Sequence, residues 1–236
     1  MDINKPTLRP QLEPIVPGSA DESCILTQLH FNSASDNKIV GRSIEHRLTA
    51  FTDDLRQVLR RFLIDNFTEI DDFDDVTDLV VEGFLDESSI RSWRWTMRYR
   101  HLVLNILRET VANQLNETRE SESFTKLFSI AWRKHLLAQS WQRMRQKQAE
   151  TGWPYFTVLD CRYRKPWLTN RDLLQEISGV LKSHPTKQTF RVFLYRCERR
   201  FAREVFTAVL NTIHLPTPEA IQSELSALDL LQYSLN

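Results

Sequence analysis

The stretch KQTFRVFLYRCERRFAREVFTAV, residues 187–209, decides the fold that we expect for this chain. Its apolar residues recur at the i, i+3, i+4, i+7 spacing of one buried helical stripe, which predicts a single long helix. The members of this stripe are Phe190, Phe193, Leu194, Cys197, Phe201, Val205 and Ala208. Four arginines share a different face, namely Arg196, Arg199, Arg200 and Arg203, and Arg191 lies one turn earlier. The helix is therefore predicted to be apolar on one side and basic on another.

A shorter helix is predicted just upstream, over TNRDLLQEISGVL, residues 169–181. Thr169 is the expected N-cap, with Asp172 at the capping-box position three residues on. Residues 182–186 then form a short turn, because Pro185 cannot continue the first helix. A short helix, a tight turn and a long helix with a basic face form the helix-turn-helix pattern, whose second helix enters the DNA major groove.

A family resemblance is visible in these two segments. FRVFLYRCERRF, residues 190–201, resembles the recognition helix in region 4 of bacterial sigma factors of the extracytoplasmic-function class. It is most similar to the divergent planctomycete group, in which this run has the form VRxxLxRxRxRF. LLQEISGVL, residues 173–181, is similar to the first helix of that motif, of the form LAxxLG. Glu198 departs from the pattern, because it stands where the family carries Arg.

The resemblance implies that this helix reads the upstream promoter element. Residues nearest its N-terminus are expected to reach base edges, and these are Lys187, Gln188, Thr189 and Arg191. The later arginines are expected to hold phosphates, which gives affinity without sequence information, and these are Arg196, Arg199, Arg200 and Arg203.

Charge is distributed unevenly along a chain whose formal net charge is zero. Residues 1–90 hold 8 Lys and Arg against 18 Asp and Glu, whereas residues 91–215 hold 23 against 10. Three further acids follow in residues 216–236. A basic middle is what a nucleic-acid-binding protein would show despite an overall neutral charge. The alternative is an ordinary solvated helical surface.

The histidines, cysteines and glycines of the sequence indicate no catalytic chemistry. The six histidines have no HxxxH or HExxH spacing, and the three cysteines form no CxxC pattern or disulfide framework. Only five glycines are present, and no phosphate-binding loop or nucleophile elbow is visible. We therefore expect no enzyme activity, cofactor or metal site. With no apolar run of membrane length and no signal segment, we expect a soluble, cytoplasmic protein.

An acidic stretch, EIDDFDDVTDLVVEGFLDE at residues 69–87, follows a helix predicted over residues 43–67. The segment after Asp74 is predicted to form a second helix with Val76, Leu79, Val80 and Phe84 inward. The simplest interpretation is a well-capped surface helix whose acids suit the positive end of the helix dipole. Alternatively, DDFDD is the DDxxD of a Mg²⁺-dependent prenyl-diphosphate enzyme, although the second acidic motif that such a site needs is absent.

The family offers a third interpretation of this stretch. DVTDLVVEGFL resembles the AEDLxQExF helix of sigma region 2, which docks on the clamp helices of RNA polymerase. The resemblance implies polymerase contacts at Asp78, Leu79, Glu82 and Phe84. Val81 replaces the polar Gln of the family pattern with an apolar side chain.

Residues 91–115, RSWRWTMRYRHLVLNILRETVANQL, are predicted to form a long helix that begins with interleaved cations and aromatics. Such a run suits single-stranded nucleic acid, because guanidinium groups neutralise phosphates while rings stack on bases. The alternative places the aromatics in the core and the arginines in solvent. RYRHLVLNILRETVANQL also resembles the sigma region 2 helix that opens the downstream promoter element. The resemblance implies contacts at Arg98, Arg100 and Arg108, where the family keeps basic residues. With the cations and aromatics of the same run, the predicted downstream contacts are Trp93, Arg94, Trp95, Arg98, Arg100, His101 and Arg108.

Together these patterns predict an all-α protein with two helical domains. The predicted parts are an extended or disordered arm at 1–43, a region 2-like helical domain at 44–116, a linker at 117–123, a region 4-like helix-turn-helix domain at 124–215 and a C-terminal helix at 216–236, capped by Thr217. The expected function is sigma-factor-like transcription initiation, with core RNA polymerase, promoter DNA and an anti-sigma or other regulatory protein as partners. The principal alternative is a helix-turn-helix regulator that no longer binds polymerase.

Overall fold

A computed structural model describes residues 37–86, 98–115, 122–181, 185–214 and 216–234, with side chains described from residue 51 onward. Within these residues the protein is all-α, with eight α-helices and no strand. Inside these ranges no helix combines the length and apolarity needed to cross a membrane. Residues 1–44 and 45–236 form two units, and of the first only residues 37–44, at the start of helix α2, are described.

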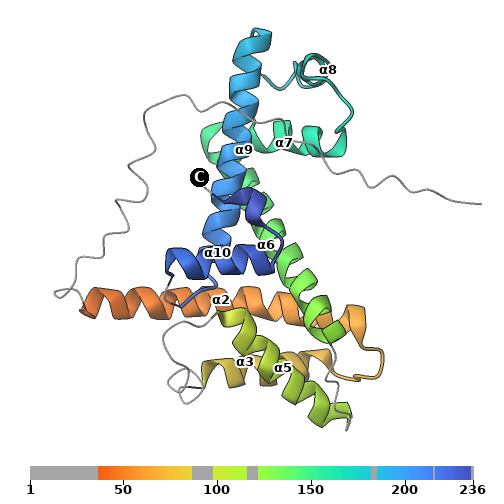
Figure 1. The fold of residues 1–236 in the computed structure, drawn as a ribbon, viewed down its shortest axis with the longest axis vertical. Helices are drawn as coiled ribbons and strands as arrows, with labels where there is room; N and C mark the ends of the chain where they lie inside the picture. Colours follow the sequence, from red (N-terminus) through yellow and green to blue (C-terminus); the bar gives the residue numbers. More distant parts are fainter. Residues whose placement is uncertain (1–36, 87–97, 116–121, 182–184, 215, 235–236) are drawn as a thin grey trace, which may run out of the picture. The chain divides into compact units, whose positions relative to one another are not determined.

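Figure 1 shows the helices in chain order. Their bounds are α2 (Asn37–Asn66), α3 (Phe73–Leu85), α5 (Tyr99–Leu115), α6 (Glu122–Thr151), α7 (Tyr155–Arg164), α8 (Asn170–Glu176), α9 (Lys187–Leu210) and α10 (Pro218–Ala227), followed by a 3-10 turn, η1 (Leu231–Tyr233). Helix α2 starts at Asn37, six residues before the predicted Ser43, although Gly41 in that span costs a helix about 1 kcal/mol relative to Ala. The predicted start of α5, residues 91–97, lies outside the described residues.

One aromatic cluster joins α2 to the beginning of α6. Phe62 of α2 is almost fully buried, and its ring meets those of Phe124 and Phe128 edge-on at centroid distances of 5.5 and 5.3 Å. Helices α3 and α5 pack against each other (Figure 1). The inward face of α3 includes Val81, whereas Leu79 is 43% exposed, so the predicted inward position of Leu79 is wrong.

Helices α6 and α9 run side by side and hold the second part of the core (Figure 1). The stripe predicted for α9 is confirmed, because all of its members are buried except Phe193, which is half-buried. Burying such side chains stabilises a fold by about 1.5–3 kcal/mol each. The basic residues of α9 are therefore directed away from this stripe.

Helix ends follow the polar residues of the sequence. The N-caps predicted at Thr169 and Thr217 are confirmed, because their side chains accept hydrogen bonds from the backbone N–H of Asp172 and Ala220. Helix α6 ends at Thr151, before Gly152, whose φ of 67° lies in the left-handed region that favours glycine.

Candidate nucleic-acid interface

Helices α8 and α9 are separate elements, and both start at threonine caps. Leu173 of α8 and Phe190 of α9 are fully buried, which fixes the two helices to the body. After α8 the chain turns through a hydrogen bond from Val180 N–H to the carbonyl of Ile177. Thr186 caps α9 by accepting from the backbone N–H of Thr189, a role that the sequence analysis did not assign. The result is a short helix, a turn over residues 177–180 and a long helix from residue 187; residues 182–184 lie outside the described residues.

The first turn of α9 presents its predicted base-reading residues to solvent. Lys187, Gln188, Thr189 and Arg191 are all exposed. The Thr189 hydroxyl shares a hydrogen bond of 2.9 Å with the Thr186 hydroxyl, so it is held close to the cap. Three long polar side chains are thus available at the helix end that can approach base edges.

The later arginines of α9 fall into two groups. Arg196 and Arg203 are exposed, whereas Arg199 and Arg200 are half-buried. The Arg200 guanidinium lies 5.2 Å from the centroid of the Tyr155 ring, and its Nε atom is buried without a hydrogen-bond partner among the described residues. Arg196 and Arg203 are therefore the members best placed to meet phosphates, and Arg200 also packs within the protein.

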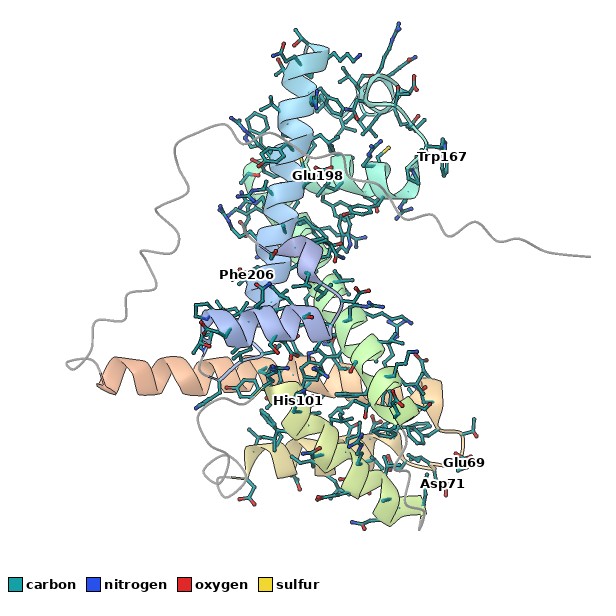
Figure 2. All side chains as sticks on the ribbon, in the orientation of Figure 1. Glu69, Asp71, His101, Trp167, Glu198 and Phe206 are labelled. Carbon is teal, nitrogen blue, oxygen red and sulfur yellow. The ribbon has the colours of Figure 1, made fainter. Side chains whose placement is uncertain are left out.

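Glu198 lies apart from the exposed arginines. It is half-buried on α9 (Figure 2). Burial raises the pKa of the Glu198 carboxyl, and attraction to Arg162 of α7 opposes that rise. Its charge is therefore directed toward the α7 side of the helix, and the acid that departs from the sigma pattern does not replace an exposed cation.

The start of α5 meets α10 through a buried ion pair. The Arg100 side chain, 3% exposed, donates from Nε to Glu224 Oε1 at 2.7 Å and from a terminal nitrogen to Oε2 at 3.2 Å. Arg100 also donates to the Ser129 hydroxyl of α6 at 3.0 Å. Arg98 lies 3.4 Å from Glu224 Oε2 and donates to the Ser223 hydroxyl. Both arginines thus hold helices together.

The other members of the predicted downstream set are placed as follows. Arg108 is half-buried, donates to the Thr125 hydroxyl and lies 5.9 Å from the Phe124 ring centroid. The His101 side chain is exposed at the beginning of α5 (Figure 2). Neighbouring protein still removes part of the water around its ring, and this desolvation, together with the Arg100 charge, lowers the pKa of His101. Trp93, Arg94 and Trp95 lie outside the described residues. Among the described members, only His101 is exposed.

The predicted polymerase contacts on α3 are divided between surface and core. Asp78 is exposed and pairs with Arg56 of α2. Leu79 and Glu82 are exposed without such a partner among the described residues. Phe84 is fully buried, so its side chain packs in the core and is not on the surface that a partner could contact. Val81, at 1% exposure, occupies the core at the position where the sigma pattern has a polar docking residue.

The acids of DDFDD have structural roles at the start of α3. Asp72 caps the helix by accepting from the backbone N–H groups of Asp74 and Asp75, and Arg60 donates to Asp74 at 2.6 Å. Glu69 and Asp71 are exposed in the segment between α2 and α3 (Figure 2). In the part of the chain that the structure describes, no group of three or more His, Cys, Asp or Glu residues is arranged to hold a metal ion.

No protein-family model, curated protein or solved structure matches this chain. The geometry of α8 and α9, and the distribution of charge around them, therefore carry the functional argument.

Proposed function

We propose that this chain is a sigma-factor-like DNA-binding protein that acts in transcription initiation. The observation that carries the proposal is the exposed polar end of α9, where Lys187, Gln188 and Arg191 project from a capped helix that follows a short helix and a turn. In proteins that read DNA this way, the N-terminal residues of the second helix contact base edges.

Affinity would come from the cations farther along the same helix. Arg196 and Arg203 are exposed, and residues 91–215 carry a surplus of 13 positive charges. Neutralising phosphates with such groups releases counterions, so binding should weaken steeply as salt rises. Arg199 is included in the phosphate-binding group, whereas Arg200 contributes mainly through its position over Tyr155.

The polymerase-binding part of the proposal rests on α3. Asp78, Leu79 and Glu82 form an exposed edge that can meet a partner. In this proposal residues 44–116 contact polymerase and the downstream element, and residues 124–215 read the upstream element. The second candidate is a helix-turn-helix regulator without polymerase binding. It is favoured by Val81, because this residue is apolar and buried where the sigma pattern has a polar side chain that docks on polymerase.

DNA reading is tested with the tightest-binding duplex selected from a random pool and a scrambled duplex of the same composition. Arg191→Ala is expected to reduce discrimination between the two by about 1–3 kcal/mol, the range of a bidentate base contact. Arg203→Ala should weaken binding to both duplexes alike and lower the salt dependence. Lys126→Ala, an exposed cation of α6 outside the predicted interface, is the control. Equal losses on both duplexes for Arg191→Ala would contradict its role.

Polymerase binding is tested by pull-down with purified core polymerase, followed by run-off transcription from the selected DNA. The sigma-like function predicts capture by the wild type and loss of capture in Glu82→Lys, which reverses an exposed charge. Glu150→Lys, which reverses an exposed charge at the end of α6, serves as the matched control. DNA binding without polymerase capture would instead select the regulator.

A further inference from the structure

A groove of about 700 Å³ lies beside the first half of α9. One wall is the corner between α6 and α7, with Trp153 and Pro154, and another is the segment before α9, with Leu181. The third is α9 itself, with Val192, Phe193 and Arg196. This volume falls within the range of about 300–1,000 Å³ that is usual for small-molecule sites.

The groove is lined mainly by apolar and aromatic groups. Trp153 is 58% exposed although its ring lies 6.0 Å from that of Phe193, and Val192 is 48% exposed. Gly152 makes this placement possible, because its left-handed φ lets the chain reverse between α6 and α7 and carry Trp153 over the groove. An exposed indole and valine in one concavity offer apolar area that a ligand can cover.

The charge of the groove is positive. Arg196 is exposed, and it makes no ion pair with any residue that the structure describes. Among the described residues of the lining there is no Asp or Glu, and the other polar side chains, Thr186, Gln188 and Thr189, are neutral. Arg200, one turn farther along α9, is instead placed over Tyr155. Of the lining residues that the structure describes, Arg196 is thus the one with a charge, and it lies beside apolar and neutral polar side chains.

We propose that this groove binds a small amphipathic anion, an aromatic or aliphatic carboxylate. The apolar body would cover Trp153, Val192 and Phe193, and the carboxylate would accept hydrogen bonds from the Arg196 guanidinium. A guanidinium presents paired donors that match a carboxylate in a bidentate arrangement, which makes such pairs stronger than neutral hydrogen bonds. The concave shape and moderate volume favour a small molecule over a peptide, which would need a longer surface.

Gln188 and Thr189 line the groove and also belong to the predicted base-reading set. Any effect of a bound ligand on DNA binding therefore rests on the proposed function. Ligand binding itself does not require that function. A calorimetric test without DNA therefore separates failure of this proposal from failure of the proposed function.

The test uses the full chain and two probes that share an apolar body, 1-naphthaleneacetate and its neutral amide, in isothermal titration calorimetry. The wild type should bind the acid saturably at one site and the amide more weakly. Arg196→Gln should weaken binding of the acid by at least about tenfold, the loss of one charge-assisted contact, and leave the amide unchanged. Trp153→Ala should weaken both probes.

Arg171→Gln is the matched control, because it removes an exposed arginine of α8 that is not among the described residues lining the groove. It should leave both affinities unchanged. Equal weakening of the acid by Arg196→Gln and Arg171→Gln would overturn the proposal, as would the absence of saturable binding. An acidic amphipathic peptide that binds through Arg196 when the small acid does not would also overturn it, and would assign the groove to a macromolecular partner.

Discussion

Glu224→Gln tests whether the C-terminal helix is an integral part of the fold. Glu224 is fully buried on α10, and its two carboxylate oxygens accept from Arg100 at 2.7 and 3.2 Å. The glutamine has nearly the same shape but no charge, and its amide nitrogen cannot accept the second bond. Arg100, 3% exposed, would then remain charged and buried with part of its hydrogen bonding lost.

The expected destabilisation is large. Breaking a buried ion pair by removing one partner costs about 3–5 kcal/mol. The glutamine oxygen retains one acceptor, and Arg98, with a partly exposed side chain, can turn toward solvent, so we expect the lower end of that range. Domains are commonly stable by about 5–15 kcal/mol, so the variant should still fold at 25 °C. Urea unfolding, followed by circular dichroism, measures the difference.

Two further variants make the result specific. Arg100→Met with Glu224→Leu removes both charges, and should recover at least half of the loss, because apolar replacements of a buried pair are often neutral. Asp229→Asn removes an exposed partner of Arg133 while keeping a residue type that tolerates the φ of 54° at this position. It should cost under about 1 kcal/mol. A Glu224→Gln effect below that of Asp229→Asn, or a double variant no more stable than Glu224→Gln, would refute the reasoning.

Three other predictions concern stability and reactivity. Because burial raises the pKa of Glu198, its carboxylate opposes folding at neutral pH; Glu198→Gln should raise the urea midpoint at pH 7.5, and this advantage should vanish below pH 4.5, the ordinary carboxyl pKa, where both folded and unfolded states are protonated. An advantage that persists unchanged at low pH would contradict this cause. Burial also raises the pKa of the Cys197 thiol to about 12, so a variant with Cys197 as its sole cysteine should react with a disulfide reagent at pH 8 only after unfolding in urea; rapid labelling of the native protein would count against it. Gly83→Ala should gain less in urea unfolding than the roughly 1 kcal/mol that Ala usually adds to a helix, because its Cβ would lie 3.1 Å from the Cγ2 methyl of Ile106. In the Ile106→Ala background, which lacks that methyl, Gly83→Ala should show the full gain, and a gain that stays reduced there would contradict this cause.

Much of the fold could be predicted from local patterns. The stripe that begins at Phe190 could be identified because a helix that buries one face repeats its apolar residues every three to four positions. The caps at Thr169 and Thr217 could be identified because they precede helical runs with an acid or a proline at favoured positions. The cap at Thr186 lacks that acid or proline, so its only signal is a hydroxyl residue before an apolar repeat.

The candidate site was harder to predict, because burial depends on residues far apart in the chain. Arg98 and Arg100 stand in a basic, aromatic run that suits nucleic acid, but their partner Glu224 lies more than 120 residues away. Local sequence cannot distinguish a cation that faces solvent from one that joins two helices. On α3 a signal did exist: Val81 lies four residues after the buried Thr77 and three before Phe84, a spacing that places all three on one face.

Both proposals involve α9, because this helix packs against the core with one face and presents polar side chains to ligands on its other faces. Its buried stripe fixes the helix against α6 and α8, which leaves the remaining faces with fixed directions. Residues near the N-terminus of α9, such as Arg191, are then exposed, whereas the Arg200 guanidinium lies over the Tyr155 ring and Glu198 faces Arg162. Arg196 lies between these groups, exposed beside apolar side chains, so it can meet either a phosphate or a carboxylate in the groove. If both proposals hold, DNA and the small anion compete for the same guanidinium, and the helix that reads DNA would also sense the anion.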